Sequence, residues 1–268
     1  MKTSMRAALL GIAIVSSGGC HFAGSLAKEV VVAASSHRGW DTFTFKGQLP
    51  AEFGIDVYAL YGPENPDSPS CQSPTFTPGE TVTRSHSQHY TEDISDKPQS
   101  FDFDIPLTYT KGLCPMKLGR LSLEINARHG PLKWQKAYGR GNFYISNKPS
   151  SDYTAFPASG ILNVDTQCGF LFQESRIYIG IDKRLICNST GAYLNREELK
   201  NKTLNLLVDS DVEEEPAHNE TWIKFPQGWK PCAHKGQWRW CKAPIEFKTF
   251  QMDGKTCTIY PGCTESER

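Results

Sequence analysis

Apolar and polar residues alternate with a period of two along several short segments of the chain. In residues 41–49, Phe43, Phe45 and Leu49 lie on one face and polar side chains occupy the other. The same pattern covers residues 55–60, 101–105 and 121–126. One apolar and one polar face are typical of antiparallel strands that cover a core on one side, so these segments are predicted to be strands.

Further strands are expected in the second half of the chain, at 170–172, 176–181 and 203–208. The connecting loops are rich in proline and glycine, most clearly at 62–70 and 75–79. Short strands separated by such loops are typical of β-sandwiches and open barrels. The sequence therefore predicts a mainly β fold built from antiparallel, sandwich-like units.

One segment, residues 194–200, has the features of a helix. Asn195 can cap its N-terminus, because an asparagine side chain accepts a hydrogen bond from a backbone N–H of the first turn. Glu197 and Glu198 fall in that turn, where negative charge interacts favourably with the helix dipole. One short helix is therefore expected within the β fold.

A polar segment at 147–152 interrupts the strand pattern and suggests a domain boundary. About 120 residues lie on each side of it, which is a normal domain size. This indicates two β-rich units, residues 28–148 and residues 149–268, of which the second is rich in cysteine. One larger sandwich is the alternative.

The N-terminus has the three parts of a secretion signal. Lys2 and Arg6 provide a basic start, residues 7–15 form a short apolar run, and small residues follow it. The apolar run is too short to cross a bilayer, which takes roughly 20 residues. The chain is therefore expected to be exported.

Two sites compete for cleavage of this signal. Gly18-Gly19-Cys20 resembles the lipobox of bacterial lipoproteins, although Ser17 stands where that motif usually has leucine. The resemblance implies that residues 1–19 are removed and that Cys20 carries lipid. Because His21 rather than aspartate follows, it also implies an outer-membrane protein that faces the periplasm. The alternative is a cut after Ala27, which leaves a soluble periplasmic protein.

The chain has nine cysteines, and eight remain once Cys20 is lipidated or removed. Eight can pair completely in an oxidising compartment. Closing a short loop costs the least entropy, so neighbours are expected to pair. The expected disulfides are Cys71–Cys114, Cys168–Cys187, Cys232–Cys241 and Cys257–Cys263. No C-x-x-C motif and no close Cys/His group is present, so a metal site is not expected. The sequence contains no cofactor-binding motif, so a cofactor is not expected either.

The charge of the chain gives no sign of a nucleic-acid partner. It has 29 basic and 29 acidic residues, and removal of residues 1–19 leaves 27 and 29. Nucleic-acid-binding domains are usually strongly basic on one face. Binding to DNA or RNA is therefore not expected.

The tryptophan-rich segment near Cys241 contains the candidate partner-binding residues, Trp229, Trp238, Arg239 and Trp240. Exposed indoles in a loop stiffened by a disulfide would provide a platform for a sugar ring or anchors in a protein interface. The competing interpretation is that they cover the core of a small disulfide-rich unit.

Three other patterns in the sequence provide no catalytic or metal-binding residue. His86 and His89 would lie on opposite faces of a strand. The acidic run at 209–215 lacks the glycine that a calcium loop needs. Ser159 lacks the first glycine of the G-x-S-x-G motif.

Together these features indicate an exported envelope lipoprotein that binds a partner protein and meets the membrane through its N-terminal lipid only. The most specific version of this prediction is an immunity protein that occludes a toxin in the periplasm, such as a secreted lipase effector. One alternative is a carbohydrate- or envelope-binding module that uses Trp238 and Trp240. Another is a hydrolase whose site is not visible in the sequence.

Overall fold

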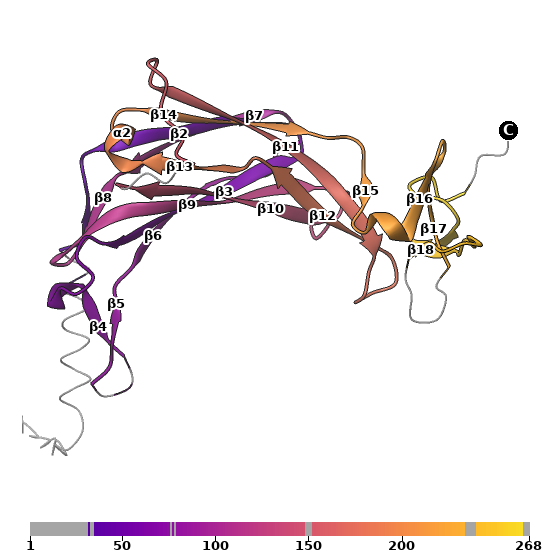
Figure 1. Cartoon of the computed structure of the whole chain (residues 1–268), viewed down its shortest axis with the longest axis horizontal. Helices are drawn as coiled ribbons and strands as arrows, with labels where there is room; N and C mark the ends of the chain where they lie inside the picture. Colours follow the sequence, from indigo (N-terminus) through magenta and orange to yellow (C-terminus); the bar gives the residue numbers. More distant parts are fainter. Residues whose placement is uncertain are drawn as a thin grey trace, which may run out of the picture.

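The computed structural model describes residues 32, 35–75, 77, 79–147, 152–233 and 240–264. Two layers of β-strands form the body of the molecule (Figure 1). This confirms the mainly β, sandwich-like fold predicted from the alternating pattern.

The lower sheet in Figure 1 has seven strands in the described part of the chain. They are β1 (His37–Arg38), β3 (Phe53–Pro63), β6 (His86–Glu92), β8 (Thr108–Lys111), β9 (Cys114–Arg128), β10 (Lys136–Ser146) and β13 (Gly191–Asn195). The long strand β9 pairs with β3 on one side and with β8 and then β10 on the other. It therefore organises this layer.

The upper sheet contains β2 (Thr42–Leu49), β7 (Gln99–Pro106), β11 (Ile161–Glu174), β12 (Ile181–Asn188), β14 (Thr203–Ser210) and β15 (Glu215–Pro216). Strand β14 lies between β2 and β11 and runs parallel to both. Strands from before and after the polar segment at 147–152 thus share one sheet.

The core fills the space between the two layers. Phe43, Phe45 and Leu49 are buried on one face of β2, as their spacing predicts. The ring of Phe45 lies 5.3 Å from that of Phe101 on β7 and 5.9 Å from that of Phe143 on β10 in the other sheet. Aromatic contacts between the layers therefore help to hold them together.

The two layers approach each other closely where β10 meets β12 and the turn after it. A Cβ atom on Gly139 would lie 2.7 Å from Cys187 Sγ, and one on Gly141 would lie 2.1 Å from the carbonyl oxygen of Thr190. The Asn142 amide donates a hydrogen bond to the same carbonyl, at 3.0 Å. Only glycine fits at these two inward-facing positions of β10.

All four predicted disulfides are present: Cys71–Cys114, Cys168–Cys187, Cys232–Cys241 and Cys257–Cys263. Cys168 and Cys187 face each other across β11 and β12. The prediction from loop length was correct because each bridge joins segments that are neighbours along the chain as well as in space.

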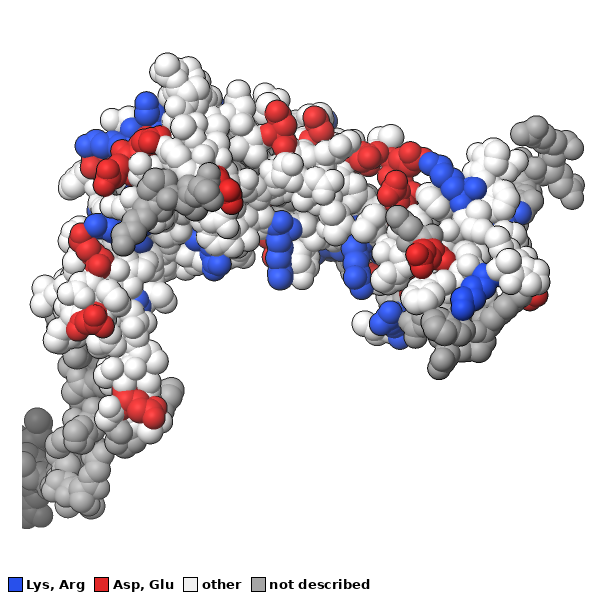
Figure 2. All heavy atoms as spheres, viewed as in Figure 1, with Lys and Arg blue, Asp and Glu red and all other residues white. Residues whose placement is uncertain are grey.

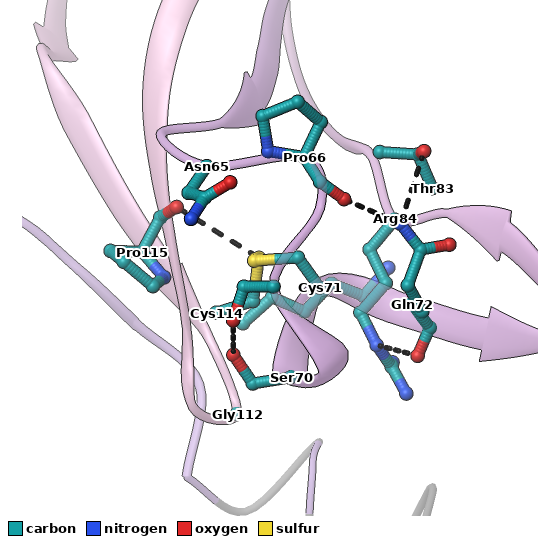
Figure 3. Close-up of a disulfide and its surroundings, with 12 residues drawn as sticks. Asn65, Pro66, Ser70, Cys71, Gln72, Thr83, Arg84, Gly112, Cys114 and Pro115 are labelled. Atoms are coloured by element: carbon teal, nitrogen blue, oxygen red, sulfur yellow. Dashed lines mark hydrogen bonds between the residues drawn. A yellow bond between two sulfur atoms is a disulfide. The ribbon is translucent and has the colours of Figure 1, made fainter.

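One of these disulfides fixes the root of a small arm at the left of Figure 1. The arm contains η1 (Pro69–Cys71) and a hairpin of β4 (Gln72–Pro74) and β5 (Thr81–Thr83). Cys71 and Cys114 are both fully buried and join the arm to the start of β9 (Figure 3). The buried Arg84 supports this junction, since its Nε donates a hydrogen bond to the carbonyl of Gln72 at 3.3 Å.

The chain ends in a second small unit at the right of Figure 1. It contains η2 (Asn219–Thr221), β16 (Trp222–Phe225), β17 (Gly228–Pro231), β18 (Phe250–Met252) and β19 (Lys255–Cys257). Phe172 at the end of β11 joins its core, with the ring stacked 4.0 Å from that of Tyr260. An ion pair between Lys248 and Glu174, at 2.5 Å, adds to the junction.

The predicted helix is present as α2 (Arg196–Leu199). The side chain of Asn195 accepts a hydrogen bond from the Glu197 amide at 3.2 Å, which confirms the predicted cap. Arg196 donates to the carbonyl of Leu118 at 3.0 Å and so ties the helix to β9.

The prediction of a strand over 176–181 was wrong for all but its last residue. Residues 175–180 form the turn between β11 and β12, closed by a hydrogen bond from the Ser175 amide to the Gly180 carbonyl at 2.9 Å. The Ser175 hydroxyl accepts from the amides of Ile177 and Tyr178, at 3.2 and 3.3 Å. These local bonds satisfy the backbone without a neighbouring strand.

No helix in the described part of the chain has both the length and the apolar character needed to cross a bilayer.

Candidate binding face

The outward surface of the lower sheet is rich in tyrosine and polar side chains. Strands β3, β9 and β10 bury about every second residue, and β6 and β13 alternate between less and more exposed positions, so the remaining side chains of all five strands point away from the core. We call this surface the lower-sheet face. Its residues include Asp56, Tyr58, His89, Ser122, Glu124, Asn126, Tyr138, Arg140, Asn142, Tyr144 and Tyr193. Tyrosine, arginine and small polar residues are the composition typical of protein-binding surfaces.

Two stacked ring pairs stand on this face. Tyr58 on β3 and His89 on β6 are opposite each other in the register, and their rings are 4.6 Å apart and nearly parallel. Tyr144 on β10 and Tyr193 on β13 form the second pair, at 5.2 Å. Stacking restricts the rotation of each ring, so little side-chain entropy is lost when a partner covers it.

Polar contacts hold the neighbouring side chains in place. The carboxylate of Asp56 lies 2.7 Å from His89 Nε2 and accepts a hydrogen bond from Asn126 Nδ2 at 2.8 Å. Arg140 lies over the ring of Tyr138, 5.0 Å from its centroid, and its Nε is 3.9 Å from Glu124. The face is therefore ordered before any partner binds.

A shallow groove of about 480 Å³ continues the face between β10 and β12. Lys136, Tyr138 and Arg140 line one side, and Lys183 and Arg184 line the other. Glu214 pairs with Lys183 at 2.6 Å, but it does not line the groove. None of the described lining residues is acidic. The groove therefore carries net positive charge.

The molecule is hollowed on the side of the lower sheet. Figure 2 shows an arch, with the β4–β5 arm at one end and the C-terminal unit at the other, and basic side chains at the edge of the hollow between them. In this view the lower sheet lies above the hollow (Figure 1). A partner bound to the lower-sheet face would thus have parts of the chain on two sides.

Trp229 and Trp240, two of the four predicted partner-binding residues, lie in the C-terminal unit and not on the lower-sheet face. Trp229 is half-buried and packs against the cluster around Phe172, with the rings 6.2 Å apart. Trp240 is 48 % exposed. Trp238 and Arg239 lie outside the described residues, as does the predicted lipidation site Cys20. The use of these residues in binding stays a prediction.

His86 and His89 fall on opposite faces of β6, as predicted for a strand. His86 points inward, where its ring stacks 3.6 Å from that of Tyr109 and burial lowers the pKa of its imidazole. Among the described residues there is no group of three metal-ligating side chains.

The acidic run at 209–215 has a structural role at the junction with the C-terminal unit. Glu213 pairs with Lys224 on β16. Glu214 pairs with Lys183 on β12 and accepts a hydrogen bond from the Tyr260 hydroxyl. Glu214 therefore joins β12 of the sandwich to the C-terminal unit, and Glu213 ties the acidic run to β16.

Sequence reasoning missed the lower-sheet face. Tyr58, Tyr138 and Tyr144 occupy the polar positions of alternating segments, which is a signal that the sequence contains. Their approach to one another depends on the pairing of β3, β9 and β10, which alternation alone does not specify.

Comparison of the chain with models of protein families, with characterised proteins and with solved structures gave no match.

Proposed function

We propose that this chain is an exported envelope protein that binds a partner protein through the lower-sheet face. The observation that carries the proposal is the ordered set of tyrosines on that face, next to a basic groove. Tyrosine and arginine are enriched among the residues that dominate binding energy. The most concrete form of this function is an immunity protein that occludes a toxin in the periplasm, such as a secreted lipase effector.

The charge of the groove specifies the kind of surface that the partner presents. Lys136, Arg140 and Arg184 attract carboxylates, and complementary charge both speeds encounter and disfavours wrong partners. We therefore expect the surface of the partner that enters the hollow to be acidic. High salt screens this attraction, so it should lower the association rate constant and leave the dissociation rate constant nearly unchanged.

Binding of carbohydrate is the second candidate function. The exposed rings of the Tyr144–Tyr193 pair, and the separate indole of Trp240, offer flat apolar surfaces of the kind that sugar rings cover. Retention of the protein on envelope glycans, with no stoichiometric protein captured from the host, would favour this candidate over a protein partner.

The membrane anchor belongs to the same proposal. If Cys20 is the lipidated first residue, mass spectrometry of the mature protein is expected to find a diacylglyceryl group on it. A mature N-terminus at Lys28 would instead show a soluble periplasmic protein. That result would remove the anchor from the proposal and leave the binding function to be tested separately.

Changing Tyr144 and Tyr193 to alanine together is expected to weaken partner binding by about 2 kcal/mol, or thirtyfold. Both rings are more than 40 % exposed, so their loss removes contact area without opening the core. The partner is captured from extracts of the native host with the wild-type chain. Its affinity for both forms is then measured by titration calorimetry, and their melting temperatures are compared.

Trp40→Ala is the matched control, because this indole is 97 % exposed and lies outside the lower-sheet face. It should leave the affinity unchanged. Equal affinity of the double tyrosine variant and the wild type, at equal melting temperature, would exclude this ring pair from the interface. Loss of affinity in Trp240→Ala instead would move the site to the C-terminal unit.

A further inference from the structure

Two neighbouring turns at one end of the sandwich expose large apolar side chains. They are the β9–β10 turn (residues 129–135) and the β11–β12 turn (residues 175–180). Leu132 and Trp134 on the first are 51 % and 62 % exposed, and Ile177 and Ile179 on the second are 95 % and 87 % exposed. The Trp134 ring lies 6.5 Å from that of Tyr178, so the turns form one surface, here called the apolar tips.

Local hydrogen bonds define both turns. In the first, the His129 amide donates to the Gln135 carbonyl at 2.9 Å, and the Leu132 amide donates to Gln135 Oε1 at 3.0 Å. In the second, the Ser175 hydroxyl accepts from two backbone amides. The isoleucines are thus presented by formed turns, and a group of exposed apolar side chains of this kind marks an interaction site.

The charges on the tips are all of one sign. Lys133 and Arg176 stand among the apolar residues and are exposed, and neither turn contains aspartate or glutamate. Lys136 continues the basic character onto β10. Basic residues beside an apolar, aromatic surface complement the anionic headgroups of a lipid bilayer.

We propose that the apolar tips dock on an anionic lipid surface. Ile177, Ile179 and Leu132 enter the boundary between headgroups and acyl chains. Trp134 and Tyr178 lie at the headgroup level, which their amphipathic rings favour. This contact is separate from a lipid on Cys20 and does not depend on the proposed partner.

The shape of the tips favours lipid over a protein as the occupant. The apolar residues stand at the apices of two adjacent turns, so they can enter a soft, fluid surface without a matching pocket. A protein partner would need a cavity shaped to receive both turns at once. The exposed side chains of Lys133 and Arg176 further favour a negatively charged occupant.

The test uses the chain from Lys28 onward, which lacks the signal segment and any lipid but retains every described strand. It is mixed with vesicles of phosphatidylethanolamine and phosphatidylglycerol and sedimented. Changing Ile177 and Ile179 to aspartate together is expected to lower the fraction bound, expressed as a partition coefficient, by about tenfold or more. Changing Lys133 and Arg176 to glutamate should abolish the preference for phosphatidylglycerol over phosphatidylcholine vesicles.

Val212→Asp is the matched control, since Val212 is 93 % exposed and lies outside the tips. It should bind vesicles as the wild type does. Vesicles with brominated acyl chains should quench fluorescence of the wild type more than that of Trp134→Phe. Absence of wild-type binding, or equal binding by the double aspartate variant, would overturn the proposal. So would self-association through the tips, detected as a dimer that this variant loses.

Discussion

Replacing Cys71 and Cys114 together by alanine is expected to lower the free energy of unfolding by about 4 kcal/mol. The bridge closes a loop with a sequence separation of 43 residues, and its loss restores that conformational freedom to the unfolded chain. Both sulfur atoms are buried at the junction of the arm with β9 (Figure 3). Thermal unfolding in an oxidising buffer should show a melting temperature lower by about 10 °C.

The bridge between Cys257 and Cys263 is the natural comparison, because its sequence separation is only 6. Its double alanine variant should lose about 2 kcal/mol by the same entropic argument. Equal losses in the two variants would show that loop length does not govern the effect. A negligible loss in the first would mean that the arm contributes no stability through its attachment.

Phe172→Ala is expected to detach the C-terminal unit from the sandwich. Phe172 is fully buried, and its ring contacts Trp222 at 5.1 Å and Tyr260 at 4.0 Å, measured between ring centroids. Truncating a buried phenylalanine to alanine costs about 3–5 kcal/mol. The cost falls on the junction, so limited proteolysis should cut near residues 211–218 much faster than in the wild type, while the sandwich stays resistant.

Leu171→Ala is the control for this prediction. Leu171 is adjacent in β11 but only half-buried, and it lies outside the cluster around Phe172. Its change should leave the cleavage rate near that of the wild type. If Phe172→Ala instead lowers the stability of the whole chain in one cooperative step, the sandwich and the C-terminal unit unfold together.

Features that depend on neighbouring residues were predictable from the sequence. The alternation in β2, β3, β7 and β9 correctly predicted the buried face of each strand. Successive side chains of a strand point to opposite faces of the sheet, whichever strands lie beside it. The cap of α2 was found because the interacting groups are two residues apart. The disulfides followed from the low entropy cost of short loops.

Features that depend on distant residues were not predictable in this way. Alternation does not specify which strand lies beside which, so it did not predict the pairing of β2 with β14. The run Ile177-Tyr178-Ile179 alternates like a strand, yet Ser175 holds it in a turn where the isoleucines are exposed. The pattern shows which residues are apolar, but it does not show whether the fold buries them in a core.

The position of β14 also determines when the molecule can fold. Thr44 on β2 pairs with Thr203 on β14, so the centre of the upper sheet joins residues that lie far apart in the sequence. During synthesis from the N-terminus, β2 and β7 are made long before β14. Until β14 is available, the edge of β2 that pairs with it stays open. Contacts of such long range make folding slow, and open strand edges favour aggregation meanwhile. If the chain is exported as proposed, the upper sheet can therefore be completed only after β14 has crossed the membrane.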